Sequence, residues 1–214
     1  MDSAVAAAWA RKEGYGLITL AVDYGQRHGI ELAAAEALSK ALGADEHLRI
    51  AVDLRAVGGS ALTSPEPVPK GGSASESSIP PTYVPARNTL FLSLALGLAE
   101  VRDAGAIVIG ANSVDYSGYP DCRPEFLEAF ERLGSVATKA GLAGKAPRIL
   151  APLIDLAKSE IVKEGLRLDV PFGMTFSCYD PPSDNEHCGE CDACLLRKRG
   201  FGEAGVPDPT RYRR

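Results

Sequence analysis

Four of the five cysteines gather near the carboxyl end of the chain, within the stretch CYDPPSDNEHCGECDAC. Two overlapping C-x-x-C steps follow a first cysteine across a polar loop, so that four thiolates can reach one ion. They are Cys178, Cys188, Cys191 and Cys194. Tetrahedral zinc accepts four sulfur ligands, and a site closed in this way leaves no position for a reactive water. The spacing therefore predicts a structural zinc site without a catalytic role.

Two other chemistries fit the same cysteines. A C-x-x-C-x-x-C run also occurs in the ligation of iron–sulfur clusters, and a C-x-x-C pair can act as a redox dithiol. In a cytosolic protein, paired cysteines are more often metal ligands than disulfides, which favours a metal here. The fifth cysteine, Cys122, stands apart in PDCRPEF and is interpreted as an ordinary loop thiol.

A second group of chemically useful residues lies in GANSVDYSGYPDCRPEF, residues 110–126. The stretch follows a predicted strand and precedes a predicted helix, and such loops form the binding crevice of open parallel sheets. It offers aromatic rings that can stack on a ligand, carboxylates that accept hydrogen bonds, and an arginine guanidinium that donates several. The candidate substrate-binding residues are Asp115, Tyr116, Tyr119, Asp121 and Arg123. The structural alternative is a solvent-exposed loop whose tyrosine rings only pack over neighbouring residues.

Two basic residues stand at the start of predicted helices. Arg87 and Asn88 open the apolar run in VPARNTLF, with Asn88 as the expected N-cap. Lys158, in PLIDLAKSEI, lies in the first turn of a later helix. It is either a phosphate contact or an exposed lysine of the first turn, and we favour the phosphate contact.

Helices and strands alternate along the chain, which places these residues at the ends of elements. The apolar patterns predict helices over 2–14, 30–42, 88–102, 125–139 and 156–166, the last of them capped by Asp155. They predict strands over 15–22, 48–52, 106–110 and 149–153. This order is typical of an α/β fold with a mainly parallel sheet and helices on both faces.

Composition limits the class of protein and its partners. The 214 residues are 45% hydrophobic and 24% charged, which is enough to bury a substantial core. The formal charge of −5 disfavours nucleic acid as a direct partner. No apolar run reaches the roughly 18–20 residues that span a bilayer, so we expect no membrane partner and a cytoplasmic location. Residues 58–83 are rich in Gly, Ser and Pro, which predicts either disorder or a lid over the substrate.

Six ordered blocks, spread nearly from end to end, carry a resemblance to a known family. Singly they are weak signals, but their order and positions together are specific. The chain resembles the 7-cyano-7-deazaguanine synthase family of queuosine biosynthesis. The blocks are MDSAV, DYGQRH, PARNTLFLSLALGLAE, GANSVDYSGYPDCRPEF, TFSCY, and HCGECDACLLRKRGF with GVPDPTRY.

The resemblance implies a fold, a reaction and cofactors. It implies a Rossmann-like ATP pyrophosphatase of the adenine nucleotide alpha hydrolase type, with a nucleotide-binding domain over 1–170 and a zinc-binding segment over 171–214. It implies conversion of 7-carboxy-7-deazaguanine, ammonium and ATP to 7-cyano-7-deazaguanine, with magnesium on the phosphates and bound zinc. Lys158 and Arg87 become the expected catalytic contacts to phosphate or carboxylate. We also expect a homodimer.

The phosphate loop of that family reads Ser-Gly-Gly-x-Asp-Ser and joins the first strand to the first helix. Met1, Asp2 and Ser3 match only its last three positions. The resemblance thus implies that Asp2 and Ser3 are ATP-binding remnants of this loop, and that the first strand is missing. We expect a start assigned inside the loop, or a fragment, and weak ATP binding by the chain as written.

Two alternative functions remain open from the sequence. A related ATP pyrophosphatase that acts on another carboxylate would resemble this chain in its N-terminal half. A non-catalytic, zinc-stapled purine-binding fragment is also consistent with the incomplete phosphate loop. Release of pyrophosphate in the presence and absence of 7-carboxy-7-deazaguanine distinguishes the three functions.

Overall fold

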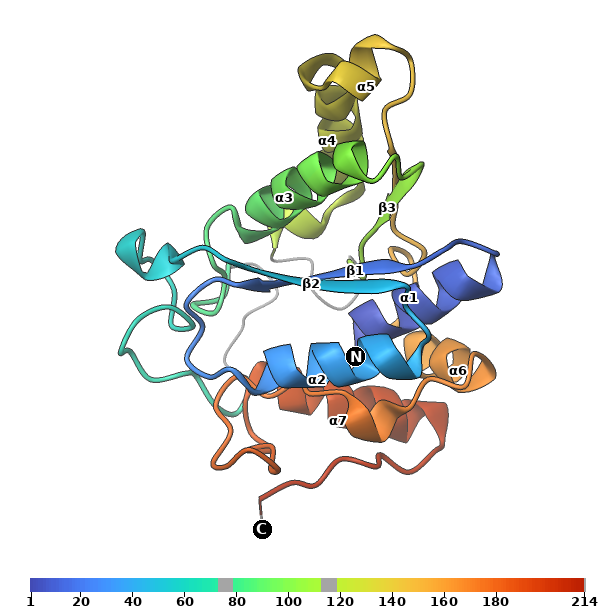
Figure 1. Cartoon of the computed structure of the whole chain (residues 1–214). Helices are drawn as coiled ribbons and strands as arrows, with labels where there is room; N and C mark the ends of the chain where they lie inside the picture. Colours follow the sequence, from blue (N-terminus) through green and yellow to red (C-terminus); the bar gives the residue numbers. More distant parts are fainter. Residues whose placement is uncertain (73–78, 113–118, 214) are drawn as a thin grey trace.

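Helices and strands alternate along most of the chain in the computed structural model, which describes residues 1–72, 79–112 and 119–213 (Figure 1). The helices are α1 (Asp2–Lys12), α2 (Ile30–Ala41), α3 (Arg87–Val101), α4 (Pro124–Ala137), α5 (Lys139–Leu142), α6 (Lys158–Arg167) and α7 (Asp192–Ala204). The strands are β1 (Ile18–Asp23), β2 (Glu46–Ala51), β3 (Ala106–Val108) and β4 (Arg148–Leu150). The predicted α/β class is confirmed.

The four strands pair in parallel. β1 pairs with β2 from Ile18 opposite Glu46 to Asp23 opposite Ala51. β3 pairs with β4 from Ala106 opposite Arg148 to Val108 opposite Leu150. Within the described part of the chain these are two separate two-stranded sheets. The prediction of parallel pairing is confirmed. β1, β3 and β4 are shorter than predicted, and β2 begins two residues earlier and ends one residue earlier than predicted.

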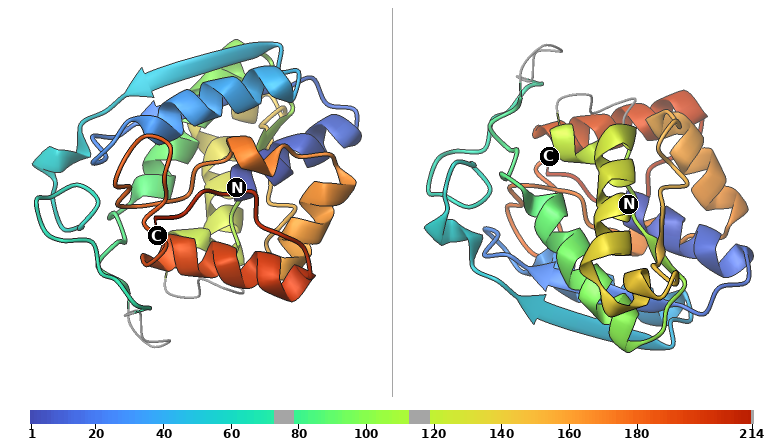
Figure 2. Two further views of the ribbon diagram at one scale, coloured as in Figure 1. Left: turned by 90° about the horizontal axis from the view of Figure 1, so that it is seen from below. Right: turned by 90° about the horizontal axis from the view of Figure 1, so that it is seen from above.

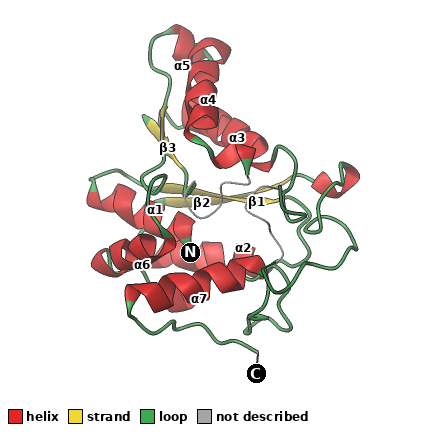
Figure 3. Cartoon of the chain, turned by 180° about the vertical axis from the view of Figure 1, so that it is seen from behind, coloured by secondary structure: helices red, strands yellow, loops and turns green. Residues whose placement is uncertain are grey.

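Helices cover both sides of the β1–β2 pair (Figure 3). On one side lie α3, α4 and α5, and the Phe91 ring of α3 packs against the core around Val22 of β1. On the other side, α1, α6 and α7 share a core that includes Val5, Ile161 and Phe201. Burial of these apolar faces, at about 25 cal/mol per Å² of apolar surface, is the main force that holds the layers together.

Two predicted helix caps are wrong. The N-cap of α3 is Ala86, in the left-handed region at φ 55°, and Asn88 lies inside the first turn. The N-cap of α6 is Ala157 rather than Asp155, and its N–H donates to the Glu160 carboxylate at 2.7 Å. In α6 the acceptor is the glutamate at the third position of the same helix. In α3 a side chain from elsewhere satisfies the first turn, which a local pattern cannot reveal.

The predicted helix over 125–139 is two helices. Thr138 adopts extended backbone at φ −125° and ψ 156°, which ends α4. Its hydroxyl then accepts a hydrogen bond from the Gly141 N–H at 2.8 Å and so caps α5. A threonine at this point acts as the N-cap that its residue type favours.

Helix α7 begins directly after Cys191, includes Cys194, and was not predicted. It ends at Gly205, whose φ of 74° is readily adopted only by glycine, and it packs along α6. Figure 2 shows α1, α6 and α7 grouped at one side of the molecule. The boundary predicted between 1–170 and 171–214 stays a prediction.

The described part of the loop over 58–83 is packed rather than disordered. Leu62 and Val68 are buried in the same core as the cysteines. The Gly71 N–H donates to the Glu190 carbonyl at 2.9 Å, and Lys70 forms an ion pair with Asp180 at 2.7 Å. The expectation of disorder is therefore wrong for 58–72. Among the described helices, none has the length and apolar character needed to cross a membrane.

Candidate functional site

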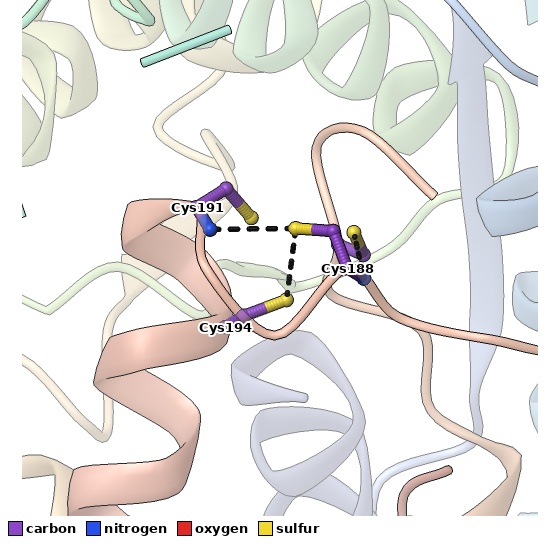
Figure 4. Close-up of side chains that lie close together, drawn as sticks. Cys188, Cys191 and Cys194 are labelled. Atoms are coloured by element: carbon purple, nitrogen blue, oxygen red, sulfur yellow. Dashed lines mark hydrogen bonds between the residues drawn. The ribbon is translucent and has the colours of Figure 1, made fainter. Parts of the chain in front are cut away.

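The four predicted metal ligands converge on one point. Their Sγ atoms all lie within 4.8 Å of one another, and all four side chains are buried. Cys188 and Cys194 are 3.9 Å apart, sulfur to sulfur, and Figure 4 shows both facing Cys191. Sulfurs bound tetrahedrally to zinc at about 2.3 Å lie about 3.8 Å apart. The cluster could therefore hold a metal ion with little rearrangement.

Backbone N–H groups turn toward these sulfurs. The Cys188 N–H donates to Cys178 Sγ at 3.2 Å, and the Cys191 N–H donates to Cys188 Sγ at 3.3 Å. Hydrogen bonds of this kind hold ligands in place and stabilise negative charge on sulfur. All five cysteines are free thiols, so no disulfide competes with the metal. The donor set fits a soft or borderline ion.

A cavity of about 350 Å³ lies next to the cysteine cluster. Its walls come from the start of α1, the start of α3, the segment after β3, the start of α6, and the cysteine-bearing segment. The polar side chains that line it include Asp2, Ser3, Glu31, Arg87, Asn88, Tyr119, Lys158, Tyr179 and Arg197. Most of the predicted catalytic and nucleotide contacts therefore share one cavity.

Lys158 is buried in the wall of this cavity rather than exposed on the protein surface. Its residue is 6% exposed, and its Nζ donates to the Asp2 carboxylate at 2.7 Å. Two glycines permit this close assembly. A Cβ on Gly200 would lie 2.5 Å from Lys158 Cγ, and one on Gly110 would lie 2.6 Å from the Ser3 nitrogen. The alternative of an exposed lysine is wrong.

Arg87, which lines the cavity, lies over two aromatic rings. Its guanidinium carbon lies 5.8 Å from the ring centroids of both Tyr24 and Phe91. Its Nε is buried and has no hydrogen-bond partner within the described residues. An unpaired guanidinium N–H beside a cavity is a donor available to an anionic ligand.

The predicted substrate loop is only partly described. Asp115 and Tyr116 lie outside the described residues. Tyr119 is buried, lines the cavity, and shares a 2.9 Å hydrogen bond with the Thr82 hydroxyl. Arg123 is exposed at the N-cap of α4. The structure thus brings Tyr119, but not Arg123, to the cavity.

Asp121 has a structural contact at the start of α3. Its carboxylate accepts a hydrogen bond from the Asn88 N–H at 3.0 Å, and its carbonyl accepts one from the Asn88 side chain at 2.9 Å. The pair is buried. Asp121 therefore supplies the cap that the sequence assigned to Asn88.

Replacing Asp121 with alanine should destabilise the protein. The substitution leaves the buried Asn88 N–H without its acceptor, which costs about 1–3 kcal/mol. Urea unfolding measures this loss. Glu128→Ala, at an exposed position of α4, is the matched control and should change the free energy of unfolding by less than about 0.5 kcal/mol. Equal stability of Asp121→Ala and the control would contradict the capping role.

Arg197 is a cavity residue that the sequence did not predict. It is 1% exposed, and its Nε lies 3.1 Å from an Asp208 carboxylate oxygen. Other nitrogens of the guanidinium donate to Thr175 Oγ1 at 2.5 Å and to the Phe172 carbonyl at 3.1 Å. Tyr212 donates to the same carboxylate at 2.6 Å. The chain after α7 thus fixes this arginine in place.

A pattern in α7 could have found Arg197. Cys194, Arg197 and Phe201 are three and four residues apart, so they share one helix face, and all are buried. An arginine on the apolar face of a helix needs a partner from elsewhere in the chain.

Asp208 should make stability depend on pH. Burial acts to raise its pKa, but the Tyr212 hydroxyl and Arg197 outweigh burial and hold this pKa below its usual range. Asp208→Asn should therefore cost about 3–5 kcal/mol at pH 7. Because the pKa of Asp208 is lower in the folded state than in the unfolded state, its negative charge adds stability at pH values above the unfolded-state pKa. This stability is lost as the pH falls through the folded-state pKa. The difference in unfolding free energy between wild type and Asp208→Asn should therefore shrink below about pH 4.

Urea unfolding of wild type and Asp208→Asn at pH 7 and at acid pH measures this difference directly. Glu203→Gln, an exposed change on α7, is the control and should show no such trend. A constant difference across the pH range would mean that the charge of Asp208 contributes nothing to stability.

Comparison with known proteins gives matches over almost the whole chain. The family model for the queuosine biosynthesis protein QueC matches residues 1–205. The 7-cyano-7-deazaguanine synthase of Myxococcus xanthus is 54% identical over 214 residues, which cover 99% of this chain and 93% of that protein. The enzyme of the same name from Nitrosococcus oceani is 56% identical over 213 residues, with 99% and 94% covered.

Among solved structures, NMN synthetase from Francisella tularensis aligns with a TM-score of 0.49 and 20% identity, over 96% of this chain and 74% of that chain. The sequence matches are far stronger, and the range that the family model matches spans the four clustered cysteines and the cavity. The chain belongs to the QueC family of queuosine biosynthesis proteins.

Proposed function

We propose that this protein is a 7-cyano-7-deazaguanine synthase, which uses ATP and ammonium to convert the carboxyl group of 7-carboxy-7-deazaguanine to a nitrile. The observation that carries the proposal is identity of 54% to a relative of that name over 99% of the chain. The cavity supports it, because basic residues, carboxylates and aromatic rings surround a space of about 350 Å³. That volume suits a small molecule.

The reaction needs two activations. A carboxylate is a poor electrophile, so transfer of AMP from ATP first gives a mixed anhydride and releases pyrophosphate. Ammonia then attacks the carbonyl carbon, and AMP leaves with the electron pair of the broken C–O bond to give the amide. Activation of the amide oxygen, followed by loss of that oxygen and two N–H protons, forms the nitrile.

Lys158 and Arg87 are the proposed contacts to phosphate or carboxylate. Both line the cavity, and both offer N–H donors there. Asp2 and Ser3 stand at the N-terminus of α1, where backbone N–H groups favour an anion such as a nucleotide phosphate. One Asp2 oxygen binds Lys158, which places the ammonium group beside the proposed phosphate position.

Magnesium fits the second Asp2 oxygen. Asp2 Oδ1 is buried and lacks a hydrogen-bond partner among the described residues. A carboxylate oxygen is the ligand type that magnesium takes alongside phosphate oxygens. Bound there, magnesium would neutralise charge on the nucleotide phosphates.

For the deazaguanine base we propose the loop over 110–126. Tyr119 forms part of the cavity wall, and its ring lies 5.8 Å from that of Tyr83. Asp115 and Tyr116 stay proposed contacts of the substrate. Asp121 already holds the start of α3, so any contact with the base would use its other carboxylate oxygen.

Zinc is the proposed occupant of the cysteine cluster, and its role is structural. The cluster joins the segment that carries Phe176, Ser177 and Tyr179 to α7, and all of these lie against the cavity. A homodimer and a cytoplasmic location complete the proposal. Sedimentation analysis tests the dimer.

The assay is pyrophosphate release by the protein with ATP, magnesium and ammonium, with and without 7-carboxy-7-deazaguanine. We expect release that depends on the acid, and a nitrile product identified by mass spectrometry. Turnover with a different carboxylate instead would favour a sibling pyrophosphatase. Binding of the deazaguanine without any pyrophosphate release would favour a non-catalytic purine-binding module.

A further inference from the structure

Basic side chains from three helices line the described wall of the cavity, and two of them have an acidic partner. Lys158 Nζ lies 2.7 Å from an Asp2 oxygen. Arg197 Nε lies 3.1 Å from an Asp208 oxygen. Arg87 forms no ion pair with a carboxylate of the described residues, and its buried Nε has no hydrogen-bond partner among them. Since a charged donor left unpaired in the interior is costly, Arg87 is the cation of this wall that calls for an anionic ligand.

Two aromatic rings hold the Arg87 guanidinium. Its central carbon lies 5.8 Å from the ring centroid of Tyr24 and 5.8 Å from that of Phe91. The two rings are 5.7 Å apart and inclined at 54°, so the guanidinium and the rings form a nearly equilateral triangle. Cation–π attraction to both rings restricts the arginine to this position.

The rings themselves stand on well-fixed backbone. Tyr24 directly follows β1 and is 6% exposed. Its N–H donates to the Gln26 side chain at 2.9 Å, and its carbonyl accepts from the Leu54 N–H at 3.0 Å. Phe91 lies four residues after Arg87 on α3, so both side chains share one face of that helix. The end of β1 and the start of α3 therefore fix the arginine from two sides.

The position of Arg87 favours the substrate over the nucleotide as the source of the anion. Asn88, the next residue, donates to the Asp121 carbonyl at 2.9 Å, in the loop over 110–126 that we propose for the base. Tyr119 of the same loop is close enough to interact electrostatically with Arg87. The proposed phosphate position lies instead at the starts of α1 and α6. The anion attached to the base is the carboxylate of the acid.

We propose that Arg87 recognises the carboxylate of the substrate, and that Tyr24 and Phe91 are the residues that position it. This assignment rests on the proposed function. Nε donates a charge-assisted hydrogen bond to one carboxylate oxygen. The second oxygen stays free to attack the α-phosphorus of ATP, from which pyrophosphate leaves with the electron pair of the broken P–O bond.

Glu31 limits the anion affinity of this site without occupying it. This residue lines the same cavity, and its charge interacts with that of Arg87 from beyond ion-pair distance. Recognition through charge also separates the substrate from the product, because the acid is negatively charged and the nitrile is neutral, although both carry the same ring. Arg87 should therefore favour the acid and leave the nitrile free to dissociate.

The test is calorimetric titration of wild type and Arg87→Gln with the acid, the nitrile and ATP in separate experiments. We expect the Kd for the acid to rise by about tenfold to a hundredfold in Arg87→Gln, the range for loss of a hydrogen bond to a charged group. The Kd values for the nitrile and for ATP should change less than about threefold. Arg132→Gln, at an exposed position of α4, is the matched control and should change none of them.

Tyr24 is tested by the ratio of the Kd values for nitrile and acid, which compares two ligands on the same protein. Tyr24→Leu should lower this ratio by about threefold to tenfold, as expected for loss of a cation–π contact. Tyr24→Phe keeps the ring and should stay within about twofold of wild type. Tyr15→Leu, at a tyrosine that is 41% exposed, is the control. Adding Tyr24→Leu to Arg87→Gln should lower the ratio no further, because a positioning residue acts only through the residue that it positions.

Three outcomes would overturn the proposal. Equal weakening of acid and nitrile in Arg87→Gln would mean that Arg87 supports the cavity as a whole. Weaker binding of ATP with unchanged binding of the acid would assign Arg87 to the nucleotide phosphates. A further fall of the ratio in the double variant would show that Tyr24 acts independently of Arg87.

Binding and turnover separate this proposal from the proposed function. A preference for the acid that depends on Arg87, in a protein that releases no pyrophosphate, would support carboxylate recognition and contradict the synthase activity. Nitrile formation by wild type, with the same preference for the acid in wild type and Arg87→Gln, would support the activity and overturn the role of Arg87.

Discussion

Replacing Cys191 with serine will remove the metal and loosen the carboxyl-terminal segment. Cys191 is fully buried, serves as the N-cap of α7, and receives a hydrogen bond from the Tyr179 N–H at 3.5 Å. The free energy of binding a structural zinc ion also contributes to the free energy of folding, by about 10–16 kcal/mol in small zinc peptides. Even a third of that would lower the melting temperature of a protein of this size by about 6–20 °C.

The measurement combines elemental analysis with thermal unfolding under reducing conditions. We expect close to one zinc ion per chain in wild type and less than a tenth of that in Cys191→Ser, as is usual when one thiolate of four is lost. Cys122→Ser is the control, because Cys122 is a buried thiol outside the cluster. Iron with inorganic sulfide in wild type, or full metal content in Cys191→Ser, would refute the zinc assignment.

The cysteine cluster was predictable because the spacing of the cysteines is local. Three of the cysteines lie within seven residues, and the fourth precedes them by one polar loop. The parallel α/β class was predictable for a similar reason, since apolar periodicity and Gly or Pro boundaries are features of short windows. Helix α7 was missed because its apolar face is interrupted by Arg197, whose partner Asp208 lies beyond the helix.

The cavity was less predictable because its contacts join distant parts of the chain. Lys158 and Asp2 are 156 residues apart, and no local pattern pairs them. The cap of α3 comes from Asp121, 33 residues after Asn88.

Replacing Lys158 with methionine should nearly abolish activation of the acid. Methionine keeps much of the buried stem that packs on Gly200, but it removes the only charged end that binds Asp2 in the described structure. A fixed cation at a developing phosphate charge contributes about 10²–10³ to the rate. We expect pyrophosphate release to fall by that factor. Lys163→Met, at an exposed position of the same helix, should leave the rate unchanged.

A second substitution, Asp2→Asn, tests whether Lys158 acts in the reaction or only neutralises the charge of Asp2. Lys158→Met leaves the Asp2 carboxylate without its cation, and that side chain is only 26% exposed, so some stability should be lost as well. Asp2→Asn in the same protein removes the unpaired charge. The stability of the double variant should match that of Asp2→Asn alone, because neither protein has an unpaired carboxylate at this position. We expect pyrophosphate release to be lower in the double variant than in Asp2→Asn alone, because both lack the proposed magnesium ligand and only the double variant also lacks the proposed lysine contact to phosphate. Equal release by the two proteins would mean that Lys158 serves only to neutralise Asp2.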